Sequence, residues 1–285
     1  TAQLNQKIFE DELRKMNLVK EKRGLLAAID IKANSVTSIE IDEQGNKIVL
    51  FEKNSAGIFP IASLTKLMTA LVVFDLKGTY KPSQLITISR EAVLQKGQSK
   101  YGELVVGEKL SVEALLHIML IESSNDAAFA LTQPIGEEAF VSLMNIYTKN
   151  LELQNTNFIN STGLDPDNNQ GISNYSTGQD IVKIIEYILT NHPQIMEITL
   201  KQSYEVLKPN GSLHHFIPQS TNELLSEIPE IIGGKTGWTI EANGCLLLVL
   251  DNSKGGYFIN IVLGSEDRFG DMRKIIKALT GTGSL

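Results

Sequence analysis

A nucleophile and a base for it stand three positions apart early in the chain. Ser63 and Lys66 follow Pro60, and residues 61–76 carry apolar side chains at helical spacing. Residues i and i+3 of a helix share one face, with Cβ atoms about 5–6 Å apart, so the Lys66 amine can reach the Ser63 hydroxyl. A neutral amine can take the hydroxyl proton if burial or a nearby cation lowers its pKa. An exposed helix pair with no chemical role has the same spacing.

A second polar cluster follows the apolar residues that end at Ile121. Ser123 and Asn125 place a hydroxyl and a carboxamide two residues apart. On a tight turn both can point into one cleft, where Ser123 could relay a proton between Lys66 and a leaving amine, and Asn125 could hold an amide. Serine and asparagine are also the ordinary residues of a helix N-cap, so this cluster alone decides nothing.

The third cluster opens a stretch with the pattern of a β-strand. Residues 233–239 read GGKTGWT, and glycine weakens a strand unless something must approach its backbone closely. Lys235 and Thr236 offer a cation and a hydroxyl, which suit a substrate carboxylate. A phosphate-binding loop would need a glycine where Pro229 stands, and a helix rather than a strand afterwards.

The order of these clusters resembles a known signature. Ser-x-x-Lys, a Ser-Asn element and Lys-Thr-Gly are typical of class A β-lactamases and penicillin-binding proteins. Residues 61–70 (IASLTKLMTA), 123–128 (SSNDAA), 156–165 and 221–239 are similar to the D-alanyl-D-alanine carboxypeptidase family. The resemblance covers about residues 25–280, nearly the whole chain.

This resemblance implies a serine acyl-transferase that cleaves peptidoglycan stem peptides ending in D-Ala-D-Ala and is inhibited by β-lactams. It implies no metal, no cofactor and no histidine base. The backbone N–H groups of Ser63 and Trp238 would hold the oxyanion. Trp238 is a bulky residue after Lys-Thr-Gly, which leaves substrate preference open. The implied catalytic residues are Ser63, Lys66 and Ser123, and the implied substrate-binding residues are Asn125, Lys235, Thr236, Gly237 and Trp238.

Three alternatives remain open from the sequence. A class A-like β-lactamase would share every motif, but its water-activating glutamate lies in a Glu-x-x-x-Asn pattern. Here the fourth residue after Glu152 is Thr156, and Asn155 falls one position short. A DD-endopeptidase would act on cross-linked peptides with the same residues. A non-catalytic peptidoglycan sensor would lack the nucleophile or the base, and both are present.

The surrounding pattern predicts an α+β fold of the β-lactamase and DD-peptidase kind, an antiparallel sheet flanked by helices with an inserted, mainly helical subdomain. Residues 1–76 and 200–285 would form the sheet subdomain, residues 77–199 the helical one, and together one catalytic domain. The predicted helices cover residues 4–18, 61–76, 111–121, 136–151, 177–191 and 268–279. The predicted strands cover residues 25–31, 36–41, 48–51, 204–207, 213–217, 234–240, 244–250 and 257–263, and residues 160–173 form a long loop.

Composition excludes some partners. The net charge is −7 and the pI about 5.3, with scattered basic residues, so we expect neither a nucleic acid nor an anionic membrane surface to bind. No apolar run approaches the roughly 20 residues of a membrane span. The chain starts at Thr1, which suggests trimming; any membrane association would use segments absent from this chain. An extracytoplasmic location follows from where the substrate lies.

Other candidate sites are weaker. Cys245 is the one cysteine and lies in an apolar run, where we expect a buried, inert thiol. Asp165, Asp167 and Asn169 begin like a calcium loop, but Gln170 replaces the glycine that such a loop requires at its sixth position. The four histidines show no metal-ligand spacing.

Overall fold

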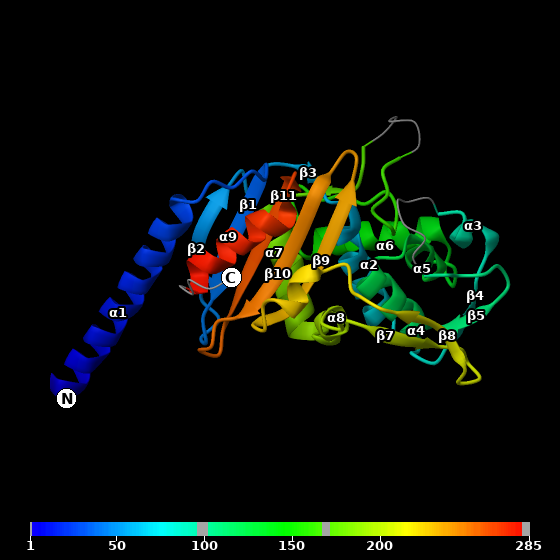
Figure 1. Ribbon diagram of the computed structural model, residues 1–285, viewed down its shortest axis with the longest axis horizontal. Helices are drawn as coiled ribbons and strands as arrows, with labels where there is room; N and C mark the ends of the chain where they lie inside the picture. Colours follow the sequence, from blue (N-terminus) through cyan, green and yellow to red (C-terminus); the bar gives the residue numbers. More distant parts are fainter. Residues whose placement is uncertain (1, 96–101, 167–171, 281–285) are drawn as a thin grey trace.

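The computed structural model describes residues 2–95, 102–166 and 172–280. Its centre is an antiparallel sheet of five strands in the order β2-β1-β11-β10-β9. The strands are β1 (Ser35–Ile41), β2 (Lys47–Lys53), β9 (Ile231–Thr239), β10 (Asn243–Asp251) and β11 (Tyr257–Ser265). Strands from both ends of the chain therefore share one sheet, which confirms the predicted α+β fold (Figure 1).

Three pairs of short strands lie outside this sheet. They are β3 (Phe59–Pro60) with β6 (Tyr175–Ser176), β4 (Leu85–Thr87) with β5 (Lys109–Ser111), and β7 (Tyr204–Leu207) with β8 (Leu213–Ile217). The third pair is the predicted hairpin, and the strands of the first two pairs were not predicted. They are too short to give a period-2 pattern.

The helices agree with most of the sequence predictions. They are α1 (Ala2–Ala27), α2 (Thr65–Asp75), α3 (Arg90–Val93), α4 (Val112–His117), α5 (Asn125–Ala130), α6 (Glu137–Asn150), α7 (Gly178–Asn191), α8 (Gln194–Thr199) and α9 (Arg268–Thr280). Three shorter helical turns are also present in the described ranges. They are η1 (Ala62–Leu64) before α2, η2 (Ile118–Glu122) after α4, and η4 (Glu223–Ser226) between β8 and β9. The Ser111 hydroxyl accepts a hydrogen bond from Ala114 N at 3.1 Å and so caps the start of α4.

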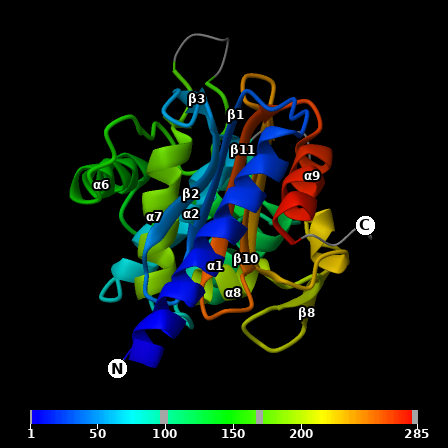
Figure 2. The ribbon, with the colours of Figure 1, turned by 90° about the vertical axis from the view of Figure 1, so that its left-hand side faces the viewer.

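Helices cover both faces of the sheet, and the neighbouring strands β10 and β11 are mostly apolar for this reason. Side chains of a strand alternate between its two faces. Leu246 and Leu248 of β10 belong to the core beneath α9, whereas Leu247 and Val249 belong to the core that includes α2 and α7. Figure 2 shows the sheet between α7 on one side and α9 on the other.

The N-terminal region differs from its prediction. The helix expected over residues 4–18 is present, but it continues to Ala27 and projects beyond the body of the molecule (Figure 1). Its apolar residues Leu4, Ile8 and Met16 are 61%, 53% and 67% exposed, so the first part of the helix does not bury an apolar face.

The strand predicted over residues 25–31 is wrong: α1 continues through Ala27, and residues 28–31 form no strand. Leu26 instead ends α1 and is buried beside α9.

Two further observations concern the organisation of the chain. No helix in the described ranges has the length and apolar character that crossing a bilayer requires. Helix α7, which belongs to the predicted helical subdomain, packs on β1 and β11 of the sheet. The division into two subdomains stays a prediction.

Candidate active site

Ser63 lies where a sharp backbone turn meets the start of a helix. Ala62, the preceding residue, has a φ of 46°, in the left-handed region that costs a non-glycine residue about 1–2 kcal/mol. Ser63 then lies in η1, and Lys66 in the first turn of α2. The Lys66 Nζ atom is 2.8 Å from Ser63 Oγ, so the predicted contact within Ser-x-x-Lys is present.

Lys66 has the surroundings of a neutral amine. Its side chain is fully buried, and besides Ser63 its Nζ atom contacts Asn125 Oδ1 at 2.8 Å and the Thr162 carbonyl oxygen at 2.5 Å. Burial, and next the charge of Lys235, lower the pKa of Lys66 well below its usual range. A neutral amine has two N–H donors and one lone pair. The two carbonyl oxygens can accept both donors, which leaves the lone pair for the Ser63 hydroxyl.

Ser123 and Asn125 lie on either side of a helix start. Turn η2 ends at Glu122. The next residue, Ser123, has a left-handed backbone with φ of 66° and ψ of 28°, and the Ser124 hydroxyl then caps α5. Asn125 therefore faces Lys66. The Ser123 Oγ atom instead accepts a hydrogen bond from Lys235 Nζ at 2.8 Å. Within the described ranges, no hydrogen bond joins Ser123 to Lys66.

Lys235 is the second buried lysine of the site. It is 1% exposed, and its Nζ atom donates to Ser123 Oγ and, at 3.0 Å, to the Thr236 carbonyl oxygen. Burial, followed by the charge of Arg268, lowers the pKa of Lys235 to about 7. An ammonium group has three donors, and the described part of the chain supplies no third acceptor. One N–H of the charged form is thus available to a ligand.

The rest of the Lys-Thr-Gly segment lies along β9, at the edge of the sheet. The Thr236 hydroxyl is 2.7 Å from the hydroxyl of Thr221. A Cβ atom at Gly237 would lie 3.0 Å from Ser63 N, so glycine lets β9 approach the turn this closely without a tight contact. Trp238 is 41% exposed.

Taken together, these contacts bring the eight predicted residues to the junction of η1, α2, η2, α5 and β9.

The loop after α6 holds the site together, and the roles of its residues were not predicted. The Thr162 carbonyl oxygen accepts from Lys66, and Gly163, at a φ of +85°, packs on the turn: a Cβ there would lie 2.0 Å from the Ala62 carbonyl oxygen. Asn174 joins this loop to α2, donating to Thr65 Oγ1 at 2.9 Å and to the Asn160 carbonyl oxygen at 3.0 Å. The segment's resemblance to the carboxypeptidase family was the available signal.

Asp165 has a different role from the calcium ligand that its spacing suggested. Its Oδ1 atom accepts hydrogen bonds from Thr239 Oγ1 and Ser173 Oγ, both at 3.0 Å. Asp165 thereby ties the loop to the end of β9. Residues 167–171, which contain the rest of the calcium-like pattern, lie outside the described residues.

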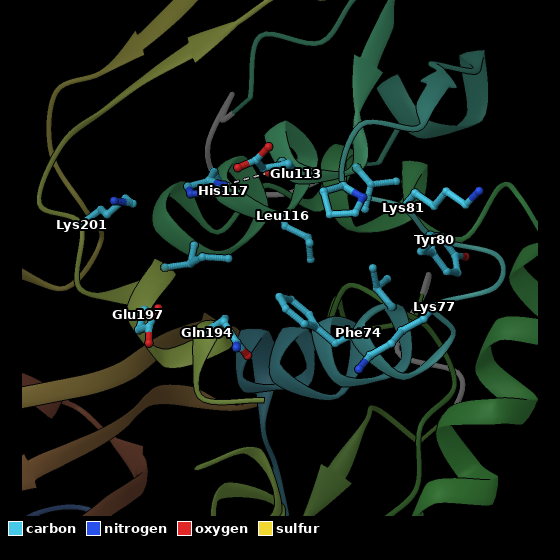
Figure 3. A pocket seen from close by; sticks show the side chains of 14 residues that line it. Phe74, Lys77, Tyr80, Lys81, Glu113, Leu116, His117, Gln194, Glu197 and Lys201 are labelled. Carbon is cyan, nitrogen blue, oxygen red and sulfur yellow. Dashed lines mark hydrogen bonds between the residues drawn. The ribbon is translucent and has the colours of Figure 1, made fainter. Parts of the chain in front are cut away.

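Other reactive groups lie elsewhere. Burial raises the pKa of the Cys245 thiol to about 12, in agreement with an inert cysteine. A hollow of about 570 Å³ lies between α2, α4 and α8 (Figure 3). Residues such as Phe74, Leu116 and Lys201 line it, and none of the eight predicted site residues does.

Comparison with known proteins decides the family. The family model described as D-alanyl-D-alanine carboxypeptidase matches residues 22–267. The chain belongs to the D-alanyl-D-alanine carboxypeptidase family. The sequence resemblance to this family is thus confirmed, and so is the fold that it implied.

Relatives within the carboxypeptidase family carry more than one name. The chain is 33% identical over 218 residues to the D-alanyl-D-alanine carboxypeptidase DacF of Bacillus subtilis, covering 75% of this chain and 54% of that protein. It thus spans about half the length of DacF. It is 27% identical over 247 residues to a D-alanyl-D-alanine endopeptidase of Escherichia coli, covering 85% of this chain and 76% of the other.

Among solved structures, the chain is similar to the ampicillin-bound penicillin-binding protein D2 of Listeria monocytogenes. The TM-score is 0.72 at 30% identity, covering 88% of this chain and 98% of the other. It is also similar to a single-residue mutant of Streptomyces K15 DD-transpeptidase, with a TM-score of 0.74 at 27% identity, covering 89% and 100% of the two chains.

Proposed function

We propose that this chain is a serine-type D-alanyl-D-alanine carboxypeptidase that removes the terminal D-alanine from peptidoglycan stem peptides through an acyl-enzyme on Ser63. The observation that carries the proposal is the 2.8 Å contact between Ser63 Oγ and the fully buried amine of Lys66. A hydroxyl becomes a nucleophile at neutral pH only beside a group that can take its proton, and a buried neutral amine is such a group.

The proposed acylation step begins with proton transfer. The Lys66 lone pair takes the Ser63 hydroxyl proton while Oγ forms a bond to the carbonyl carbon between the two D-alanines. The carbonyl oxygen becomes an oxyanion, held by the backbone N–H groups of Ser63 and Trp238. The C–N bond then breaks, and the departing amine takes a proton through the Ser123 hydroxyl. Water later cleaves the ester and restores Ser63.

The proposed binding mode uses the edge of the sheet. Lys235 and Thr236 would hold the terminal carboxylate, because the charged form of Lys235 has an N–H without an acceptor in the described structure. The free edge of β9, with Gly237, would pair with an extended peptide by main-chain hydrogen bonds. Asn125 would hold the substrate amide. Its Oδ1 atom contacts Lys66, so this residue would also link binding to the base.

The substrate implies the setting of the reaction. Stem peptides ending in D-Ala-D-Ala lie outside the cytoplasm, so we propose an extracytoplasmic protein. β-Lactams resemble this peptide end and would acylate the same serine.

Labelling with benzylpenicillin tests the proposal. We expect one drug mass on the peptide that carries Ser63, and none on that peptide in Ser63→Ala. The matched control is Ser226→Ala, at an exposed serine on η4, which should be labelled like the unchanged protein. Equal labelling of Ser63→Ala would overturn the nucleophile assignment.

The lifetime of the adduct distinguishes the β-lactamase alternative. Glu152, the nearest match to a water-activating glutamate, is exposed, and its backbone carbonyl oxygen accepts from Lys183. We therefore expect a penicilloyl-enzyme that lasts minutes or longer. Several turnovers of penicillin per second would favour a β-lactamase instead.

The endopeptidase alternative has support from the relatives that carry this name at 29% and 27% identity. Mass spectrometry of the products from a D-Ala-D-Ala pentapeptide and from cross-linked muropeptides separates the two activities. Loss of one alanine from the pentapeptide supports the carboxypeptidase. Cleavage of the cross-linked substrate alone supports the endopeptidase.

A further inference from the structure

Helix α8 contacts the strand that carries Lys235 on its outer side. Strand β9 is an end strand of the central sheet, with β10 along its inner edge. On the outer edge, the Gly234 N–H donates to the hydroxyl of Thr199, the last residue of α8, at 3.1 Å. The Thr199 hydroxyl in turn donates to the Met196 carbonyl oxygen at 2.6 Å. Its proton is thus used within α8, and its lone pairs are left to accept from β9.

The two glycines that precede Lys235 both allow this contact and make it necessary. A Cβ atom at Gly233 would lie 2.7 Å from the Cβ and Sδ atoms of Met196, so glycine lets α8 approach the strand here. Glycine also weakens a strand, because it has no side chain to pack. The pairing of β9 with β10 changes register between Val249, the partner of Gly233, and Leu250. The contact with α8 therefore stabilises a segment of β9 that the strand itself holds weakly.

Helix α8 is itself fixed to the elements that form the site. Ile195 and Met196 are 0% and 2% exposed and belong to the larger core. The helix packs on α2, which carries Lys66, on η2, which precedes Ser123, and on β9. Thr199 is 3% exposed, so its hydroxyl offers β9 a buried partner in a fixed position.

The Thr199 contact lies on the same edge of β9 as the groups proposed to bind the peptide. The N–H groups of successive residues in a strand point to opposite edges. Gly234 donates outward to Thr199, so Thr236 and Trp238 face outward as well. Lys235 thus lies between a residue that α8 fixes and the residues that would bind substrate.

We propose that Thr199 is a positioning residue, whose hydroxyl fixes Gly234 so that Lys235 presents its ammonium group to the substrate carboxylate. This inference rests on the proposed function of Lys235. Without the hydroxyl, the buried Gly234 N–H loses its partner, which is costly, and this part of β9 shifts. Lys235 moves with it, and recognition of the carboxylate weakens. The far end of β9 stays in place, because the contact between Asp165 and Thr239 holds it separately.

Acylation by benzylpenicillin and by its methyl ester tests the proposal. The ester lacks the carboxylate, so the ratio of the two second-order rate constants measures carboxylate recognition and does not depend on the amount of folded protein. In the unchanged protein we expect a ratio of about 10 to 100, the size of one charge-assisted hydrogen bond. Thr199→Ser and Thr199→Ala both lack the methyl group and differ only in the hydroxyl. The ratio should be kept in Thr199→Ser and fall about tenfold in Thr199→Ala, while the ester rate changes little. Thr199→Val, which keeps the shape of the side chain, should show the same fall.

The matched control is Thr148→Ala. Thr148 is also buried, on α6, and its hydroxyl also donates to the carbonyl oxygen three residues earlier, that of Asn145, at 2.8 Å. Among the described residues it forms no hydrogen bond with β9. Its loss should lower stability without changing the ratio. An equal fall of the ratio in Thr148→Ala and Thr199→Ala would mean that general loosening, not the contact with Gly234, weakens recognition.

Hydrogen exchange of the Gly234 amide tests the contact in the unchanged protein, without any variant. We expect this amide to exchange slowly, although it lies on the outer edge of an end strand. Rapid exchange, or an unchanged ratio in Thr199→Ala, would overturn the inference. Failure of the unchanged protein to acylate would refute the proposed function, and equal rates for the acid and the ester would refute its carboxylate role for Lys235. In both cases the Gly234 amide would still report on Thr199.

Discussion

Lys66 and Lys235 lie on two walls of the same site and have almost the same burial, but their surroundings differ. Lys66, on α2, is 0% exposed and has three oxygen neighbours, two of which can only accept hydrogen bonds. Lys235, on β9, is 1% exposed and has two oxygen neighbours. Both N–H donors and the lone pair of a neutral Lys66 amine thus have a partner. The charged form of Lys235 has one N–H donor without an acceptor in the described structure.

This difference shows that burial alone does not decide what a lysine does. Burial lowers the pKa of both amines, to about 7 for Lys235 and well below the usual range for Lys66. The charge of Lys235 lowers the pKa of Lys66 further. The neighbouring oxygens then decide the role of each lysine. Lys66 has a lone pair free to act as a base, and Lys235 has an N–H that can bind a substrate carboxylate. Variants that remove the lone pair of Lys66 or the charge of Lys235 should separate the two roles.

The largest effect is expected from Lys66→Arg. A guanidinium stays protonated in proteins, so the positive charge remains but the base is lost. Acylation of Ser63 by benzylpenicillin should fall on the order of 10²–10⁴-fold, the usual contribution of a general base. Stopped labelling followed by mass spectrometry measures the rate, with the exposed Lys201→Arg as control. Near-normal acylation would mean that another group takes the proton.

Lys235→Gln should affect binding rather than chemistry. Loss of a charge-assisted hydrogen bond to the terminal carboxylate costs about 1.5–3 kcal/mol. At 1.4 kcal/mol per tenfold, KM for a D-Ala-D-Ala pentapeptide should rise about 10- to 100-fold, with a smaller change in kcat. Steady-state release of D-alanine gives both constants. A large fall in kcat at unchanged KM would assign Lys235 to proton transfer through Ser123 instead.

The pH dependence of acylation should report the lowered pKa of Lys66. The reactive form is the neutral amine, and burial beside the charge of Lys235 lowers the pKa of Lys66, so this form persists to lower pH than in an exposed lysine. As pH falls through that pKa, Lys66 takes up a proton and the rate should drop about tenfold per pH unit. A rate that instead climbs tenfold per unit from pH 7 to 10 would indicate a base with the ordinary pKa of lysine.

A smaller effect is expected at the loop that links the two walls. The Thr239 hydroxyl donates to Asp165 and accepts from Ala242 N at 3.1 Å. Thr239→Val leaves this N–H and a carboxylate oxygen short of a partner, so the free energy of unfolding should fall by about 1–3 kcal/mol. Urea denaturation measures the change. Thr190→Val, at an exposed position on α7, should change it little. Equal stability of both variants would show that the Asp165 contact contributes nothing.

The sheet and the three motifs could be predicted because local sequence determines them. Helix spacing places Ser63 and Lys66 together, and the apolar runs of β10 and β11 follow from burial on both faces. The exposed α1 could not be placed, since its charged and apolar residues do not define which side meets the sheet. The predicted strand over residues 25–31 failed because the helix continues through Ala27 and buries Leu26 beside α9, and a short apolar run does not distinguish a strand from a buried helix end.

The partners of the site residues were harder to predict than the residues themselves. The Thr162 carbonyl oxygen is a backbone group, so nothing in its side chain reveals its contact with Lys66. The pairing of Ser123 with Lys235 joins residues 112 positions apart. Such contacts depend on how η2 and β9 pack, which no local pattern encodes.

The protonation state of Lys66 can be observed directly by nitrogen magnetic resonance of lysine-labelled protein, with Lys66→Arg to assign its amine. At pH 7 to 8 we expect one amine resonance with the shift of a neutral group, absent in Lys66→Arg, and we expect it to become an ammonium resonance only at lower pH. Persistence of the Lys66 ammonium up to about pH 10, as in an exposed lysine, would contradict its role as the base for Ser63.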